Sequence, residues 1–511
     1  MSSPAYAASG TGPASLTHLD EARLRGVHWR WTGIAALGDY LDAGSIVAGG
    51  AALPLWTSYL HFGSTTVSLI AAFSSNGIST GIGALVAGRL GDKFGRKFIF
   101  AWDLLIYALG AVIVAAAVNG PMLIAGYILL GLAVGIDVPT TWSLIAEFAP
   151  RRHRGMLMSL TNVAWYVGPI VILLLALAFH PLGLLGARLL FVSLLVVALV
   201  TYGLRRLLTE SPRWSLQTGR HDDVEQALAS LRDAGTPGTG EPLMHGAPAA
   251  DDAPGGAGYT AAAGAGDAAA GRTATGAGPG GDAAPAQDAT AAAASTAAGA
   301  AAQPAAPAGY RALFQRKYIR RLAFIMPIYV LWGIPAGTYG FFEPTLFKTV
   351  GAHSLATSDG LDILWFASAI IAVLVVFMPL NDRVDRRILY AISAALCGGG
   401  FFLIAFAPVS NIWVAIGNIL LFGFGQGVGL WPLQRIWSVE LFPTSLRNTG
   451  QGFLWSVMRV ILGLWSFFLA DITGSIGFSM VALMLALMFM YNLVVGGIFG
   501  PRTGGKSLEA I

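Results

Sequence analysis

The sequence predicts an all-α membrane protein whose twelve transmembrane helices form two pseudo-symmetric six-helix halves. Of the 511 residues, 55% are hydrophobic and only 11% are charged, whereas an ordinary soluble domain is roughly 25% charged. A chain with so little charge cannot cover a surface that faces water, so lipid must surround much of it. The prediction also depends on a series of long apolar stretches and on two loop motifs that occur in both halves.

Each predicted span holds the roughly 20 mostly apolar residues that a helix needs to cross the hydrocarbon core of a bilayer. In the first half the spans cover 31–56, 66–88, 98–118, 121–146, 156–179 and 185–207. In the second half they cover 322–347, 361–380, 388–408, 411–438, 449–471 and 475–499. The connections within each half are short, so we expect consecutive helices to be antiparallel.

Basic residues predict the orientation of the chain in the membrane. They are concentrated in alternate connections, at Arg89, Lys93, Arg96, Lys97, Arg151, Arg152, Arg154, Arg205, Arg206, Arg383, Arg386, Arg387 and Arg447. The positive-inside rule places these connections, and with them both termini, in the cytoplasm. Residues 1–29 do not have a basic start followed by an apolar run, so we expect no cleaved signal peptide.

The chain divides into five parts by composition. We expect a cytoplasmic tail, a first half, a cytoplasmic linker, a second half and a second cytoplasmic tail, which cover 1–30, 31–207, 208–320, 321–500 and 501–511. Within the linker, 233–309 consists mainly of Ala, Gly, Pro, Thr and Asp. Such a segment buries too little apolar surface to offset its conformational entropy, so we expect it to be disordered.

Composition also excludes several classes of function. The single cysteine, Cys397, excludes a disulfide framework and a cysteine-based metal site. The net charge of +4 comes from scattered basic residues, which gives no sign of nucleic-acid binding. We find no nucleotide-binding loop, metal cluster or nucleophile with its base, so we expect neither an enzyme nor a cofactor. The expected partners are a small polar solute and the lipid bilayer, and we expect a monomer.

Two loop motifs occur at corresponding places in the two halves. A Glu-x-x-Pro-x-x-x-Arg run follows the fourth span and the tenth, and an Asp-x-x-x-Arg run follows the second and the eighth. The paired residues are Glu147 and Arg154, Glu440 and Arg447, Asp92 and Arg96, and Asp382 and Arg386. Duplicated halves of this kind place a shared binding site at their interface, near the bilayer midplane.

The run Gly88-x-Leu-x-Asp92-x-x-Gly95-Arg96-Lys97 resembles the loop signature G-x-L-x-D-x-x-G-R-K of the major facilitator superfamily. The resemblance implies that these loops form a cytoplasmic latch, which stabilises the outward-facing state of a transporter. The residues to which it assigns this role are Gly88, Asp92, Gly95, Arg96, Glu147, Arg154, Glu210, Arg213, Asp382, Arg386, Glu440 and Arg447. The second copy of the loop lacks the glycines, so we expect it to form the weaker latch.

The run Glu210-Ser-Pro-Arg213-Trp after the sixth span resembles the E-S-P-R-W signature of the sugar porter branch. The chain departs from that branch in the membrane, because Tyr329, Arg435 and Tyr127 replace its usual span-seven glutamine, span-ten tryptophan and span-four arginine. These departures argue against a simple hexose site. The sequence around Tyr40–Asp42 and Trp437–Glu440 is similar to that of bacterial myo-inositol transporters.

Charged residues within the spans are the candidates for proton coupling, because charge at membrane depth is costly. Asp39 and Asp42 lie three positions apart in the first span and share a helix face. Two neighbouring carboxylates suit a group that binds and releases a proton, and we favour Asp42. Asp137 is either a second proton site or a salt-bridge partner, and both alternatives remain open. Asp103 is expected to be structural.

Arginines at membrane depth need either a counter-charge or an anionic solute. Arg459 lies in the middle of the eleventh span and Arg435 lies late in the tenth. We expect both to pair with acids inside the protein. If Arg459 faced the cavity unpaired, it would indicate an acidic substrate.

Amide and aromatic side chains in the central spans are the candidates for solute binding. Hydroxyl-rich solutes need amide donors and acceptors, and aromatic faces cover their C–H surfaces. Asn162 is the strongest candidate, because it stands where sugar porters place a substrate-binding glutamine. With Arg459, the remaining candidates are Trp165, Tyr166, Tyr339, Gln426, Trp431, Gln434 and Gln451. Packing within helices is the alternative role for each aromatic residue.

The sequence thus predicts a proton-driven symporter that imports a small polyhydroxylated solute, a sugar or a polyol such as myo-inositol. The proton is the only coupling ion that we expect. The alternatives are a proton-coupled symporter of organic or aromatic acids, an exporter, and a non-transporting nutrient receptor with the same fold.

Overall fold

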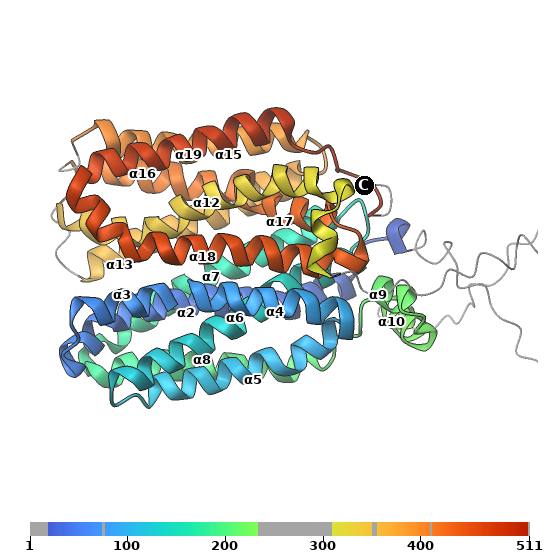
Figure 1. The fold of residues 1–511 in the computed structure, drawn as a ribbon, viewed down its shortest axis with the longest axis horizontal. Coiled ribbons are helices and arrows are strands. Elements are labelled where there is room, and N and C mark those ends of the chain that lie inside the picture. Colours follow the sequence, from blue (N-terminus) through green and yellow to red (C-terminus); the bar gives the residue numbers. More distant parts are fainter. Residues whose placement is uncertain (1–18, 74–76, 234–308, 350–354, 409–410, 509–510) are drawn as a thin grey trace, which may run out of the picture. The chain divides into compact units, whose positions relative to one another are not determined.

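The computed structural model describes residues 19–73, 77–233, 309–349, 355–408, 411–508 and 511. All regular elements among these residues are helical (Figure 1). The described parts of 1–235 and 304–511 belong to one compact unit. The segment that we predicted to be disordered, 233–309, lies almost wholly outside the described residues, and so does most of the first tail.

The first half contains six spans. They are α2 (Gly26–Leu60), α3 (Ser64–Phe73) with α4 (Ile78–Phe94), α5 (Arg96–Ala115), α6 (Gly120–Phe148), α7 (Arg154–Phe179) with the short turn η1 (His180–Leu182), and α8 (Leu184–Arg205). Two short helices follow, α9 (Pro212–Gln217) and α10 (His221–Asp233).

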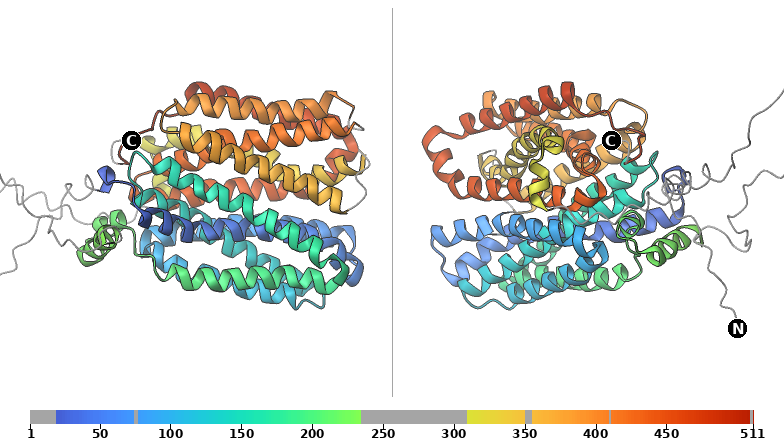
Figure 2. Two further views of the ribbon diagram at one scale, coloured as in Figure 1. Left: turned by 180° about the vertical axis from the view of Figure 1, so that it is seen from behind. Right: turned by 45° about the vertical axis from the view of Figure 1, so that its right-hand side comes forward.

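The second half repeats this arrangement after the turn η2 (Tyr310–Phe314). Its spans are α12 (Arg316–Thr349), α13 (Leu355–Ile371) with η3 (Ala372–Phe377) and α14 (Met378–Leu380), α15 (Arg386–Phe406), α16 (Ile412–Gly425) with η4 (Gln426–Leu430) and α17 (Trp431–Glu440), α18 (Thr444–Ile476), and α19 (Phe478–Phe499). Figure 2 shows the helices of each half gathered on their own side of the bundle.

Eleven helices in the described residues are long and apolar enough to cross a membrane. The helix α2, the first span in the chain, brings the number to twelve, and its 35 residues exceed the roughly 20 that a crossing needs. It carries Asp39 and Asp42, which lower its hydropathy. Large apolar side chains cover the outside of the bundle, and Val196, Val375 and Leu487 are each more than half exposed. Lipid must cover such a surface, because exposing so large an apolar patch to water is unfavourable.

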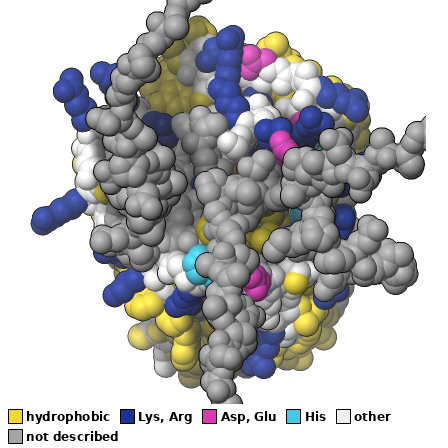
Figure 3. Space-filling model, turned by 90° about the vertical axis from the view of Figure 1, so that its right-hand side faces the viewer, with side chains coloured by type: hydrophobic (Ala, Val, Ile, Leu, Met, Phe, Trp, Pro, Cys, Tyr) yellow, Lys and Arg dark blue, Asp and Glu magenta, His cyan; other side chains and the backbone are white. Residues whose placement is uncertain are grey.

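The most extensive contacts between the two halves run along two helix pairs, α4 with α18 and α7 with α13, and α17 also packs on α6 and α7. The backbones of α4 and α18 approach closely where Gly88 faces Gly452, and a Cβ on Gly452 would overlap the carbonyl of Ala84. Small residues permit this kind of approach between membrane helices. The end of the bundle that carries the basic connections is called the basic end below. Lys and Arg side chains lie around the edge of this face (Figure 3).

Candidate functional site

An ion pair connects the two halves at the centre of the bundle. Arg435 of α17 places one guanidinium nitrogen 2.8 Å from Asp39 Oδ1 of α2 and 2.7 Å from Thr161 Oγ1 of α7. Trp142 of α6 donates its indole N–H to the same carboxylate oxygen at 3.2 Å. All four side chains are buried. Because a buried charge requires a partner, Asp39 and Arg435 hold each other across the interface.

A second pair lies one helical turn further along α2. Arg459 of α18 is 3.7 Å from Asp42 Oδ2, and Trp165 of α7 donates its indole N–H to that oxygen at 2.9 Å. The guanidinium of Arg459 lies 4.3 Å from the ring centre of Trp455. The sequence prediction that both arginines pair inside the protein is therefore confirmed by the geometry. The pairs join aspartates of one half to arginines of the other.

Aromatic rings surround these charges. The guanidinium of Arg435 lies 4.2 Å from the ring centre of Trp142 and 4.1 Å from that of Trp431, which are cation–π distances. Trp431 also packs edge-on against Trp165, with ring centres 4.4 Å apart. It begins α17 directly after the π-helical turn η4, where Gly429 leaves helical geometry. Such turns interrupt helices at functional sites.

Several polar atoms at this cluster are buried and have no hydrogen-bond partner among the described residues. The first half contributes Asp39 Oδ2, Asp42 Oδ1, Asn162 Oδ1 and Tyr166 OH, and the second half contributes Trp431 Nε1 and Trp455 Nε1. An unpaired buried polar atom costs about 1–3 kcal/mol, so folded proteins pair nearly all of them. Unpaired oxygens of the first half, most of which can only accept, thus accompany unpaired indole N–H donors of the second.

The structure brings only part of the predicted set to this cluster. Gln426 joins it, because it accepts the indole N–H of Trp332 at 3.0 Å, and the Trp332 ring packs on Trp431. Tyr339 does not, since its hydroxyl donates to Asn418 and its ring stacks on a phenylalanine of the second half.

Two glutamines lie in a neighbouring polar network of the second half. Gln434 donates to the Tyr390 hydroxyl at 2.9 Å, and Gln451 donates to Ser438 Oγ at 2.8 Å. Hydropathy locates a span but not its rotation, so the sequence could not distinguish these residues from those that face the first half.

Asp137 belongs to a separate buried cluster inside the first half. Arg205, the last residue of α8, lies 2.7 Å from Asp137 and 2.8 Å from Asp103. Of the two alternatives for Asp137, this geometry favours the salt bridge. In the sequence Arg205 stands among the basic residues of a connection, and this buried role was not predicted from it. One signal could have indicated the pairing: Arg205 ends a span, and the spans of the same half contain Asp103 and Asp137, which had no predicted partner.

The predicted latch residues form two matching ion-pair networks at the basic end. Glu147 accepts Arg96 of its own half at 2.7 Å and Arg447 of the other half at 2.9 Å. Glu440 accepts Arg386 of its own half at 2.9 Å and Arg154 of the other half at 3.3 Å. Each glutamate is buried and bridges the two halves. The halves are therefore closed against each other at this end.

The Asp-x-x-x-Arg loops differ between the two copies. Asp92 is buried, and its two carboxylate oxygens accept backbone N–H groups of Asn448 and Thr449 in the other half, at 3.2 and 2.8 Å. Asp382 lies 3.8 Å from Arg386 and is partly exposed. Gly95, between α4 and α5, has φ +97, a conformation that favours glycine.

The Glu210 and Arg213 side chains fasten the start of the linker to the first half. The Glu210 carboxylate accepts the backbone N–H groups of Arg96 and Lys97 at 2.9 and 3.0 Å, so it caps the beginning of α5. Burial raises the pKa of Glu210, although these hydrogen bonds oppose the change. Arg213 donates to the carbonyl of Glu147 and pairs with Asp20 at 2.6 Å. Nothing in the sequence indicates a role for Asp20, because it stands in a polar tail without a motif.

Comparison with known proteins agrees with this architecture. The family model of the Major Facilitator Superfamily matches residues 34–465. The chain belongs to the major facilitator superfamily. It is a multi-pass membrane transporter of the sugar porter-like type and not an enzyme, as the sequence predicted.

Among its relatives is the minor myo-inositol transporter IolF of Bacillus subtilis, which is 33% identical over 93% of this chain and 92% of its own length. The arabinose-proton symporter of Escherichia coli is 34% identical over 38% of this chain and 39% of its own length. The structure of the proton:xylose symporter XylE bound to 6-bromo-6-deoxy-D-glucose is 17% identical, has a TM-score of 0.71, and aligns with 94% of this chain and 98% of that chain. This likeness confirms the twelve-helix fold.

Proposed function

We propose that this transporter is a proton-coupled symporter that imports a sugar or a polyol such as myo-inositol. The observation that carries the proposal is the set of unpaired buried polar atoms at the interface of the halves. A polyol hydroxyl both donates and accepts a hydrogen bond, so it fits between the carboxylate and amide oxygens of the first half and the indole N–H groups of the second. The tryptophan faces fit the C–H surface of a ring.

The aspartates of α2 would carry the proton. Asp39 and Asp42 each keep one carboxylate oxygen without a partner among the described residues, and a proton from outside can bond there. Protonation removes the negative charge that holds Arg435 or Arg459 of the other half. The interface then loses an ion pair while the solute binds, and the two halves can rock about the site.

An acid as the solute is the second candidate, because two arginines lie at the site. Each arginine stands beside an aspartate, so the cluster of four side chains carries no formal net charge. An acid would need an arginine that protonation of its aspartate has released, whereas a polyol can bond to the buried polar atoms that have no partner among the described residues. The geometry therefore supports the neutral solute better.

We further propose that the basic end faces the cytoplasm of the cell, with both termini on that side of the inner membrane and with the five-part domain division given above. The positive-inside rule supports this orientation. One chain supplies both halves of the interface and the ion pairs that bridge them, so a monomer can form the whole site, and we propose that the transporter is one.

The test is uptake of labelled myo-inositol, glucose and gluconate into proteoliposomes, with and without an inward pH gradient. We expect gradient-driven uptake of a neutral solute, which Asp42→Asn loses because it cannot carry the proton. Asp471→Asn is the matched control, since Asp471 lies exposed on α18, away from the aspartates of α2.

Three outcomes would contradict the proposal. Uptake of gluconate alone would favour the acid symporter. Efflux of preloaded solute under the gradient, without uptake, would favour an exporter. Saturable binding of solute without any turnover would favour a non-transporting receptor.

A further inference from the structure

A basic surface and an apolar groove lie side by side where the linker enters the second half. The groove has a volume of about 420 Å³ and opens between the first turns of α12 and the facing part of α18. Ile319, Leu322 and Met326 line it from α12, and Phe453 and Val457 line it from α18. These positions recur at helical spacing, so the groove follows the two helix axes.

The groove lies on the part of the bundle that lipid contacts. Ile319 and Met326 belong to an apolar segment of α12 that is suited to crossing a membrane, Arg316–Tyr339. The lining consists only of apolar side chains. Phe314 of η2 also lines the groove and packs edge-on against Phe453, with ring centres 5.5 Å apart. An acyl chain fits such a track better than a polar molecule does.

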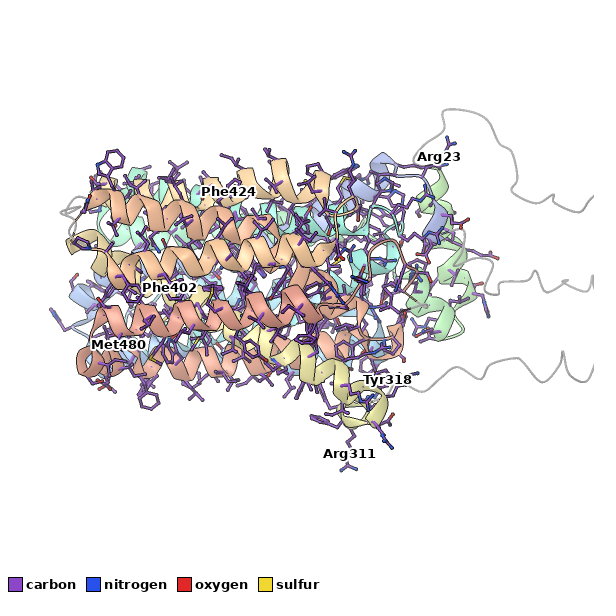
Figure 4. All side chains as sticks on the ribbon, turned by 90° about the horizontal axis from the view of Figure 1, so that it is seen from above. Arg23, Arg311, Tyr318, Phe402, Phe424 and Met480 are labelled. Atoms are coloured by element: carbon purple, nitrogen blue, oxygen red, sulfur yellow. The ribbon has the colours of Figure 1, made fainter. Side chains whose placement is uncertain are left out.

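Positive charge is concentrated beside this end of the groove. The stretch from 309 to 328 contains five basic residues and no acidic one. Arg311, Arg316, Lys317 and Arg320 are exposed, and Arg311 points away from the bundle (Figure 4). Arg321 differs, because it donates to the backbone carbonyls of Leu441 and Ile511. Four cations are thus available at the level where lipid headgroups lie.

We propose that this surface binds one anionic phospholipid, with its phosphate on Arg316, Lys317 and Arg320 and an acyl chain in the groove. Clusters of four or more basic residues next to a membrane helix attract anionic headgroups. The groove adds a place for the chain of the same molecule, so a single lipid satisfies both features. Neither feature depends on the transported solute.

The lipid surface lies next to a contact between the two halves. The hydroxyl of Tyr310, in the same turn as Phe314, donates to the carbonyl of Leu85 in α4 of the first half. The same ring packs on Phe453 of α18, with ring centres 6.2 Å apart. A lipid seated here would therefore contact the turn η2, whose Tyr310 side chain touches both α4 and α18.

The experiment is native mass spectrometry of the full chain in detergent, with added dioleoyl phosphatidylglycerol or phosphatidylcholine. We expect phosphatidylglycerol to bind about tenfold more tightly than phosphatidylcholine. Changing Arg316, Lys317 and Arg320 together to Gln should remove that preference. Ala323→Trp, which fills the exposed wall of the groove, should weaken both lipids.

The matched control changes Arg152, Arg220 and Arg383 to Gln, which removes the same charge from exposed sites elsewhere. The proposal is overturned if this control loses the preference equally, because the attraction would then be general. Equal binding of both lipids to the wild type would also overturn it. So would a preference that emerges only after the acidic residues of 234–308 are changed to Asn, since the chain's own linker would then cover the surface.

Discussion

The ion-pair network around Glu147 predicts a measurable shift between transporter conformations. Arg447 lies 2.9 Å from Glu147 across the interface, and both side chains are fully buried. At that separation two unit charges attract by about 6 kcal/mol if the effective dielectric constant is about 20. Arg96 pairs with the same oxygen, and desolvation offsets part of the gain. We therefore expect Glu147→Gln to weaken closure of the basic end by about 2 kcal/mol, which is about thirtyfold in population.

Spin labels across the basic end provide the assay. Arg152→Cys in the first half and Arg383→Cys in the second half are both exposed positions, and Cys397→Ala removes the native thiol. Double electron–electron resonance should show a short distance in the parent protein and a longer one in Glu147→Gln. The control is Glu21→Gln, which breaks the exposed pair of Glu21 with Arg151 and should leave the distribution unchanged. An unaltered distribution in a folded Glu147→Gln protein would refute the argument.

Three further predictions concern packing, capping and solute binding. Gly38→Ala should destabilise the protein by about 1–3 kcal/mol and so lower its melting temperature in detergent, because a Cβ there would overlap Asp137. Gly50→Ala in the same helix should leave the melting temperature unchanged, because the space around Gly50 is open. Burial raises the pKa of Glu210, so ionisation of Glu210 opposes folding. As the pH rises from about 4.3 to the raised pKa, the melting temperature of the wild type should therefore fall relative to that of Glu210→Gln. Parallel curves of melting temperature against pH for the two proteins would contradict this. Asn162→Ala should raise the KM for solute uptake about tenfold at similar protein stability, and an unchanged KM would remove Asn162 from the site.

The sequence by itself determined the membrane class, the spans and the duplicated loops. Each of these is a local property: a run of about 20 apolar residues can satisfy its backbone only as a helix in lipid, and loop charges report orientation without any partner. The latch acids and bases could be named for the same reason, because they lie in loops with fixed spacing. The aspartates of α2 could be named because charge is rare at membrane depth.

Only the tertiary structure decided which of these residues meet. Asp39 and Arg435 are 396 positions apart, and nothing in either span indicates the rotation that makes them face each other. The same holds for Arg205, whose buried pairing with Asp103 joins distant helices, and for Tyr339, which the helix turns into its own half. Hydropathy fixes the depth of a residue in the membrane. The direction in which its side chain points depends on how twelve helices pack, and that depends on contacts between all of them at once.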